Sequence, residues 1–188
     1  MYEMNNSTQP SKLLLHACCG PCATAVVERL MPDYDIELFW FNPNIEPEAE
    51  AQKRLENLRT VARYFNIPLI ENTEQPECWL TYVTGFEDEP EGGQRCNLCF
   101  AYRLEQTAQT AIALGHHLFA TTLTVSPHKP AGIINPLGEK IAQNHGISFL
   151  AENFKQKAGF QRSIELSREL SLYRQRYCGC RYTLPKSA

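Results

Sequence analysis

Apolar residues occur along this chain in two patterns: short continuous runs, and longer stretches in which they recur every three or four positions. Continuous runs bounded by turn residues are typical of buried strands, and the second spacing is typical of helices with one apolar face. The predicted strands span residues 13–15, 36–41, 67–70, 117–123 and 148–151. The predicted helices span residues 23–30, 46–65, 95–114, 133–144 and 161–170. This alternation predicts an α/β fold with a parallel sheet and helices on both faces.

Residues 71–94 interrupt the alternation, because they are rich in proline and glycine and contain the acidic cluster 87–89. We expect a short helix there, followed by a loop across the sheet edge. A solvated acidic loop without a function also explains the cluster. The chain is predicted to be one domain, 1–188, with flexible ends at 1–11 and 183–188 and a short helical segment near the C-terminus.

The composition is that of a soluble globular protein, with 43% hydrophobic and 21% charged residues. No basic segment leading into a long apolar stretch precedes the first strand, so neither a signal peptide nor a membrane span is expected. We therefore expect a cytoplasmic protein with no membrane partner. Eight cysteines in a reducing compartment favour metal binding or redox chemistry over a disulfide framework.

The formal net charge of −3 is unevenly distributed. Residues 151–188 carry eight basic and three acidic side chains, whereas residues 1–150 carry ten basic and eighteen acidic ones. A basic region on an acidic body suits a polyanionic partner such as RNA, although a solvated helical face has the same charge pattern. The candidate RNA contacts are Lys155, Lys157, Arg162, Arg174 and Arg176.

The chemistry of the chain centres on residues 16–22, which read His-Ala-Cys-Cys-Gly-Pro-Cys. They follow the first predicted strand and precede a helix, so three thiols lie at the carboxyl end of a strand, where open α/β sheets bind ligands. A helix N-terminus there lowers thiol pKa values and favours bound anions or thiolate-ligated metal. His16 is expected to orient the loop by hydrogen bonding rather than to ligate. Cys22 is either a ligand of a second metal or a packed thiol.

Cys96 and Cys99 have the C-x-x-C spacing with which two sulfurs converge on one metal or cluster at the start of a helix. We expect them to face the same end of the sheet as the first cysteine group. Four thiolates suffice for a 4Fe–4S cluster or a zinc site. Adjacent ligands such as Cys18 and Cys19 are unusual for structural zinc, which mildly favours the iron–sulfur alternative.

A third pair, Cys178 and Cys180, is separated by Gly179 alone. A disulfide across one residue closes a strained ring that is easily reduced, and glycine supplies the backbone freedom that this ring needs. The pair suits electron relay, while two more metal ligands or two idle thiols are the alternatives. Cys78, beside Trp79, is expected to be a core residue.

Hydroxyl side chains, a histidine and a lysine gather at the end of the fourth predicted strand. They are Thr121, Thr122, Thr124, Ser126, His128 and Lys129. Such a group can hold a phosphate or protonate an oxygen, and a turn rich in serine and threonine without a function has the same composition.

Five motifs, in this order, resemble those of the QueH family of epoxyqueuosine reductases over about residues 12–182. The motifs are Cys-Cys-Gly-Pro-Cys (18–22), Phe-Asn-Pro-Asn-Ile (41–45), Glu-Gly-Gly-Gln-Arg-Cys-Asn-Leu-Cys (91–99), Thr-Thr-Leu-Thr-Val-Ser-Pro-His-Lys (121–129) and Leu-Tyr-Arg-Gln-Arg-Tyr-Cys-Gly-Cys (172–180). The resemblance implies a Rossmann-like three-layer sandwich of the nucleotide-hydrolase or pyrophosphatase type, without the nucleotide chemistry. It also implies the last step of queuosine biosynthesis, the cobalamin-independent removal of the epoxide oxygen from epoxyqueuosine at the tRNA wobble position.

The same resemblance implies roles for individual cysteines. The expected ligands of a 4Fe–4S cluster are Cys18, Cys19, Cys96 and Cys99. Cys178 and Cys180 would be the redox-active pair, and Cys22 is the candidate ligand of one additional iron. Asn153 departs from the family, in which many members have aspartate before Phe-Lys.

Removal of an epoxide oxygen takes two electrons and two protons and gives an alkene and water. The residues fit a mechanism in which an open metal position takes the oxygen, the cluster feeds electrons and the Cys178/Cys180 pair is a local reservoir. His128 or Lys129 would assist as an acid, and the electron donor is a partner that the sequence does not identify. Two rival functions explain part of the pattern: a zinc-binding, non-catalytic RNA adaptor, and a metal-free thiol oxidoreductase.

Overall fold

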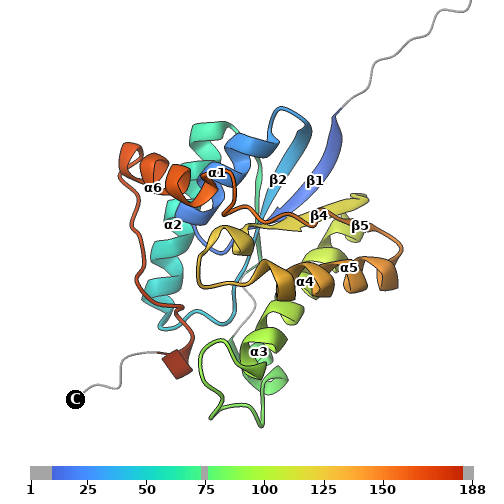
Figure 1. Cartoon of the computed structure of the whole chain (residues 1–188), viewed down its shortest axis with the longest axis vertical. Coiled ribbons are helices and arrows are strands. Elements are labelled where there is room, and N and C mark those ends of the chain that lie inside the picture. The colour runs from blue at the N-terminus through green and yellow to red at the C-terminus, as the bar shows by residue number, and fades with distance from the viewer. Residues whose placement is uncertain (1–9, 73–75, 184–188) are drawn as a thin grey trace, which may run out of the picture.

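The computed structural model describes residues 10–72 and 76–183, and its centre is a five-stranded, all-parallel sheet (Figure 1). The strand order β3-β2-β1-β4-β5 is doubly wound: the chain builds outward from β1 in one direction and then in the other. The strands are β1 (Ser11–His16), β2 (Tyr34–Phe41), β3 (Leu69–Asn72), β4 (Leu118–Thr121) and β5 (Ser148–Phe149). The predicted α/β, Rossmann-like fold is confirmed.

Helices cover both faces of the sheet. The α-helices of the described residues are α1 (Gly20–Leu30), α2 (Glu48–Phe65), α3 (Pro76–Tyr82), α4 (Gln94–Ala113), α5 (Ala131–His145) and α6 (Gly159–Glu169). Two 3-10 helices, η1 (Thr122–Val125) and η2 (Arg181–Thr183), complete the elements, and η2 forms the short helical segment near the C-terminus. Helices α1, α2 and α6 lie together on one side and α4 and α5 on the other, while α3 packs at the start of α4 (Figure 1).

Strand β1 is buried on both faces, which explains why its sequence is a continuous apolar run. Leu13 and Leu15 belong to the apolar cluster shared with α1 and α2, whereas Leu14 belongs to the cluster shared with α4 and α5. All three side chains are fully buried. The central strand is thereby fixed between two packed layers, and its carboxyl end holds a constant position.

Most boundaries differ from the predicted ones by one to three residues, and two of these differences have a clear cause. Helix α2 begins at Glu48 rather than two residues earlier, because Pro47 is in an extended conformation and forms the N-cap. Strand β4 ends at Thr121, because the Thr121 hydroxyl accepts a hydrogen bond from the Leu123 N–H and so caps η1. The connection after β4 is therefore a tight helical turn.

The irregular segment after β3 packs against the start of α4 and against the C-terminal residues. Trp79 and Val83 are fully buried there, together with Cys99 and Cys180. The segment thus packs against Cys99, one of the two cysteines of the C-x-x-C pair. The prediction that Cys78 is a core residue is wrong, because Cys78 is exposed on α3 and its neighbour Trp79 takes the buried position.

The ends of the described chain are ordered by secondary structure. Ser11 already belongs to β1, and Thr183 ends η2. The remaining predictions of flexible ends concern residues 1–9 and 184–188, which lie outside the described residues. Among the helices of the described part, none is both long and apolar enough to cross a bilayer.

Gly20 lets α1 start directly against α2. A Cβ atom at this position would lie 2.6 Å from the backbone oxygen of Asn57. Because Asn57 lies within α2, its backbone cannot easily shift to relieve this clash. We expect Gly20→Ala to lower the free energy of unfolding by about 1 to 3 kcal/mol, measured by urea denaturation. Gly132→Ala in α5 is the matched control, because a Cβ there meets nothing within 4 Å. Equal stabilities of the two variants would contradict this account of the α1–α2 contact.

Candidate metal centre and active site

The first cysteine group lies where β1 ends and α1 begins, at the carboxyl edge of the sheet. The sulfur atoms of Cys18, Cys19 and Cys22 all lie within 4.8 Å of one another, and those of Cys18 and Cys19 are 3.8 Å apart. Cys18 and Cys19 are buried, and Cys22 is half-buried. Three converging thiols with little access to water are a group that can hold a metal ion.

His16 precedes this loop and holds it in place through two hydrogen bonds of its ring. Its Nε2 donates a hydrogen bond to the Phe41 carbonyl (3.1 Å), and its Nδ1 accepts one from the Thr121 hydroxyl (2.8 Å). Burial lowers the pKa of His16 to about 4, so the ring is neutral and one nitrogen is free to accept. The ring ties β1, β2 and β4 together at their carboxyl ends, which confirms the orienting role predicted for it.

Hydrogen bonds among the three thiols shift their pKa values in opposite directions. Hydrogen bonds from Cys19 and Cys22 hold the pKa of Cys18 well below its ordinary value, and the ammonium of Lys129 adds to this effect. The hydrogen bond to Cys18 in turn raises the pKa of Cys19 to about 12, and the pKa of Cys22 is also raised well above its ordinary value by the other two thiols. Of the three thiols, Cys18 therefore loses its proton most readily, and the thiolate is the form of cysteine that binds metal cations.

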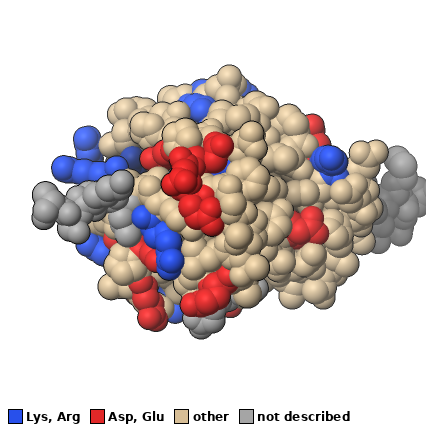
Figure 2. Space-filling view, turned by 90° about the horizontal axis from the view of Figure 1, so that it is seen from below, with Lys and Arg blue, Asp and Glu red and all other residues tan. Residues whose placement is uncertain are grey.

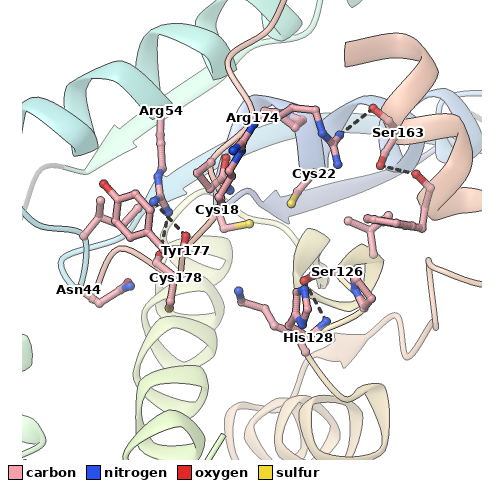
Figure 3. A pocket seen from close by; sticks show the side chains of 18 of the residues that line it. Cys18, Cys22, Asn44, Arg54, Ser126, His128, Ser163, Arg174, Tyr177 and Cys178 are labelled. Carbon is pink, nitrogen blue, oxygen red and sulfur yellow. Dashed lines mark hydrogen bonds between the residues drawn. The ribbon is translucent and has the colours of Figure 1, made fainter. Parts of the chain in front are cut away.

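A cavity of about 630 Å³ opens in front of this loop (Figure 3). Cys18 and Cys22 line it from one side and Cys178 from the other. A second, smaller cavity of about 30 Å³ adjoins it. Its walls include Cys96, Cys99, Cys178 and Cys180.

The two cavities share walls, so the cysteine groups face one region of the protein. The residues that line both are Glu91, Arg103, His128, Lys129 and Cys178. Cys96 also packs against the same apolar cluster as Cys18 and Cys19. Thiols from three distant stretches of the chain therefore meet at the carboxyl edge of the sheet.

The segment that carries Cys178 and Cys180 is held to α2 by Arg54. The Arg54 guanidinium, 3% exposed, donates hydrogen bonds to the carbonyl oxygens of Cys178 (2.7 Å) and Tyr177 (3.3 Å). Its Nε also donates to a Glu50 carboxylate oxygen at 2.6 Å. Since the next carbonyl, that of Gly179, accepts from the backbone N–H of Glu46 at 2.7 Å, three consecutive carbonyls are held.

Gly179 is required here for two reasons. Its φ of 93° lies in the left-handed region, and a Cβ would lie 2.9 Å from an Arg54 nitrogen. The two cysteines beside it differ: Cys178 is half-buried at the cavity, whereas burial raises the pKa of Cys180 to about 12.

Two further cations lie among the thiols. Arg103 is buried, and its Nε donates a hydrogen bond to the Cys99 carbonyl at 3.2 Å. Burial lowers the pKa of Lys129, but electrostatic attraction to the neighbouring cysteine sulfurs outweighs this and raises it overall. Lys129 therefore stays protonated between the first and third cysteine groups.

The threonines at the end of β4 have structural partners. Besides the contact of Thr121 with His16, the Thr122 hydroxyl accepts a hydrogen bond from the Cys18 N–H and the Thr124 hydroxyl donates one to the Glu152 carbonyl. His128 is exposed, and its N–H donates to the Ser126 hydroxyl. Of this group, His128 and Lys129 are the members whose side chains remain available at the cavity.

The basic residues predicted to bind RNA occupy different positions. Arg174 and Arg176 line the large cavity. Lys155 instead donates to two backbone carbonyls, Lys157 is exposed, and Arg162 pairs with three glutamates. On the face seen from below in Figure 2, basic and acidic side chains are interspersed rather than gathered in one basic patch.

A model of the family described as epoxyqueuosine reductase QueH matches residues 13–186 of this chain. The chain belongs to this family. QueH of Streptococcus pyogenes serotype M1 is 40% identical to it over 94% of this chain and 71% of the relative, and QueH of Thermotoga maritima is 38% identical over 92% and 90%. Membership of the QueH family agrees with the order of the five sequence motifs.

A solved structure, described as a predicted subunit of tRNA methyltransferase from Methanocaldococcus jannaschii, shares the fold. Its TM-score is 0.53 over 85% of this chain and 75% of that chain, with 11% sequence identity. At this identity the likeness concerns the fold alone. It agrees with the Rossmann-like architecture expected for a QueH protein.

Four polar residues of the site were not predicted from the sequence: Glu50, Arg54, Arg103 and Gln175. Arg54 and Glu50 occur at helical spacing with Leu58 on the inward face of α2, and a buried charged pair on an apolar face is a signal that can be read in advance. Asn153, the departure from the QueH pattern, lies before the buried Phe154, and its Oδ1 is buried with no hydrogen-bond partner among the described residues.

We expect Arg54→Met to release the C-terminal segment, because it leaves Glu50 buried without its cation and frees two carbonyls. The free energy of unfolding should fall by about 3 kcal/mol, and amide hydrogen exchange should rise over residues 173–180. Arg63→Met on the same helix is the control, since its partner is an exposed glutamate and its loss should cost less than about 0.5 kcal/mol. Unchanged exchange over residues 173–180 would refute the role given to Arg54.

Proposed function

We propose that this chain removes the epoxide oxygen from epoxyqueuosine in tRNA, as an iron–sulfur-dependent oxidoreductase in the last step of queuosine biosynthesis. The name that the QueH relatives carry supports the substrate and the reaction. The observation that carries the proposal is the meeting of cysteines from three distant stretches at two adjoining cavities. Cys18, Cys19, Cys96 and Cys99 are proposed to hold a 4Fe–4S cluster, and Cys22 one additional iron.

The donor set and its surroundings fit such a cluster. Cysteine thiolates are the ligands that iron–sulfur clusters use, and three of the four proposed ligands are buried while Cys96 is half-buried. The Cys96 sulfur accepts a hydrogen bond from the backbone N–H of Gly92 at 3.2 Å. Thiolate ligands bring negative charge into a buried region, where uncompensated charge is costly. Arg54, Arg103 and Lys129 supply positive charge around the same cavities.

The proposed redox-active cysteines can supply the electrons and protons that the reaction consumes. A bound cluster supplies electrons singly, whereas opening the epoxide to an alkene and water takes two electrons and two protons. Oxidation of the Cys178/Cys180 dithiol to a disulfide releases two electrons and two protons, which matches that demand. An external electron donor then restores the dithiol.

Lys129 is the proposed proton donor to the departing epoxide oxygen. Its ammonium stays charged between Cys18 and Cys178 and lines the large cavity. His128 lines the same cavity from an exposed position and is the second candidate. A group that keeps its proton until a more basic oxygen forms beside it is suited to general acid catalysis.

The anticodon of tRNA is proposed to bind at the mouth of the large cavity. Arg174 and Arg176 line it and can contact phosphates, and Tyr173 or Tyr177 can stack on an unstacked base. Lys155 and Lys157 lie on the connection before α6 and complete the basic region. Arg162 contributes less, because three carboxylates already neutralise it.

A zinc-binding RNA adaptor is the second candidate function, and one distance favours it. Two sulfurs bound to one tetrahedral zinc ion at about 2.3 Å lie about 3.8 Å apart. The Cys18 and Cys19 sulfurs have that separation. Metal and sulfide analysis of protein purified without air tests this candidate, because one zinc and no acid-labile sulfide would favour the adaptor. Turnover that survives chelation would instead favour a metal-free thiol oxidoreductase.

We expect Cys96→Ser to abolish both the broad visible absorption of the cluster and turnover, because one of the four cluster ligands is lost. Cys78→Ser is the control, since Cys78 is exposed on α3 away from both cavities. Absorption spectra, iron and sulfide content, and queuosine formation in tRNA are measured for both variants. Full activity in a colourless Cys96→Ser protein would refute the cluster assignment.

We expect Arg176→Ala to raise the KM for tRNA about fivefold and to reduce the slope of binding against salt concentration by about one phosphate contact. Arg162→Ala should leave KM within twofold, because that guanidinium is already paired. The measurement is steady-state kinetics at several salt concentrations. A larger rise in KM for Arg162→Ala than for Arg176→Ala would contradict the contact at the cavity mouth and would place the RNA contact on α6.

A further inference from the structure

Gln175 lies on the segment between α6 and η2, and its side chain reaches back to the first cysteine loop. Its Nε2 is 3.1 Å from the Cys19 sulfur, a contact between residues 156 positions apart. The other end of the amide, Oε1, is buried and has no hydrogen-bond partner among the described residues. Gln175 also lines the large cavity.

The nitrogen of the Gln175 amide has a hydrogen-bond partner and the oxygen has none among the described residues. This suggests that a ligand in the cavity supplies the partner of the oxygen. Buried carbonyl oxygens in folded proteins nearly always have a donor, from the protein, from water or from a ligand. Cys19 itself is fully buried and does not line the cavity, whereas Gln175 does. Gln175 thus contacts the Cys19 sulfur and also belongs to the wall of the cavity.

Resting on the proposed function, we propose that Gln175 contacts the cluster and the substrate at once. Its Nε2–H hydrogen-bonds the sulfur of ligated Cys19, and its Oε1 accepts a hydrogen bond from an O–H or N–H group of the bound nucleoside. A thiolate ligand has no proton to donate and can only accept. Ligation of Cys19 therefore selects the amide orientation that turns Nε2 to the sulfur and Oε1 to the substrate.

The contact has a predictable effect on the cluster. An N–H donor beside a ligand sulfur stabilises the more negative, reduced cluster and so raises its reduction potential. The Cys96 sulfur receives its N–H from the backbone of Gly92, which a side-chain substitution does not remove. The Gln175 side chain, in contrast, can be substituted, and its contact is shorter than that of the Thr122 hydroxyl with the Cys18 sulfur (3.8 Å).

The test compares full-length, cluster-loaded Gln175→Leu and Gln175→Glu with the wild type. Anaerobic spectroelectrochemical titration gives the potential, and turnover of epoxyqueuosine-containing tRNA gives kcat and KM. Gln175→Leu should shift the one-electron equilibrium about tenfold toward the oxidised cluster, a lowering of about 59 mV, and should raise KM at least fivefold at unchanged iron and sulfide content. Gln175→Glu keeps an acceptor oxygen, so its potential should fall while KM stays within twofold.

Gln161→Leu is the matched control, because Gln161 is exposed on α6 and contacts Glu165. An unchanged potential in Gln175→Leu overturns the cluster contact and leaves the proposed function standing. A lowered potential with unchanged KM overturns the substrate contact. Wild-type protein without iron and sulfide overturns the proposed cofactor, and this inference falls with it.

Discussion

The constraint on which the site depends is that all five strands of the sheet run in the same direction. In a parallel sheet every strand ends at the same edge, so loops that are far apart in sequence open side by side. The loop after β1 supplies the first cysteine group and the turn after β4 supplies Lys129. The burial of β1 on both faces fixes the position of the first loop, and the His16 contacts join three strand ends into one platform.

The third side of the site does not come from the sheet. The segment from Leu172 to Thr183 has little regular structure, and it holds its place through polar contacts with α2. Arg54 and the backbone of Glu46 hold the carbonyls, while the Asn57 side chain accepts from the Tyr173 N–H at 2.8 Å. A helix built on the apolar pattern of the core thus also fixes a segment that has no apolar pattern of its own.

The elements that periodicity describes well were predictable. The central strands and the long helices have strong apolar patterns, and apolar residues at helical spacing on α4, among them Phe100 and Leu104, are buried. Strand direction placed Cys18 and Cys19 at the carboxyl edge, and the expectation that Cys96 and Cys99 face the same edge rested on their position at the start of a helix. These parts are set by short-range pattern and by topology, both of which are present in the sequence.

The remaining parts depend on contacts between residues that no local pattern relates. Arg54 meets Cys178 across 124 positions, and only the folded chain brings the two together. The exposure of Cys78 depended on which neighbour turned inward, and Trp79 buries far more apolar surface. Charge counts likewise do not show that Arg162 is paired, since one of its three carboxylate partners, Glu28, is 134 positions away.

The contact between Gln175 and Cys19 has a consequence for how the protein is made. A ribosome adds about 5 to 20 residues per second, so the 156 positions between the two take on the order of 10 to 30 s to synthesise. During that interval the thiols after β1 lack the wall that later shields them from solvent. The cysteine loop therefore waits for its C-terminal cover until synthesis of the chain is nearly complete.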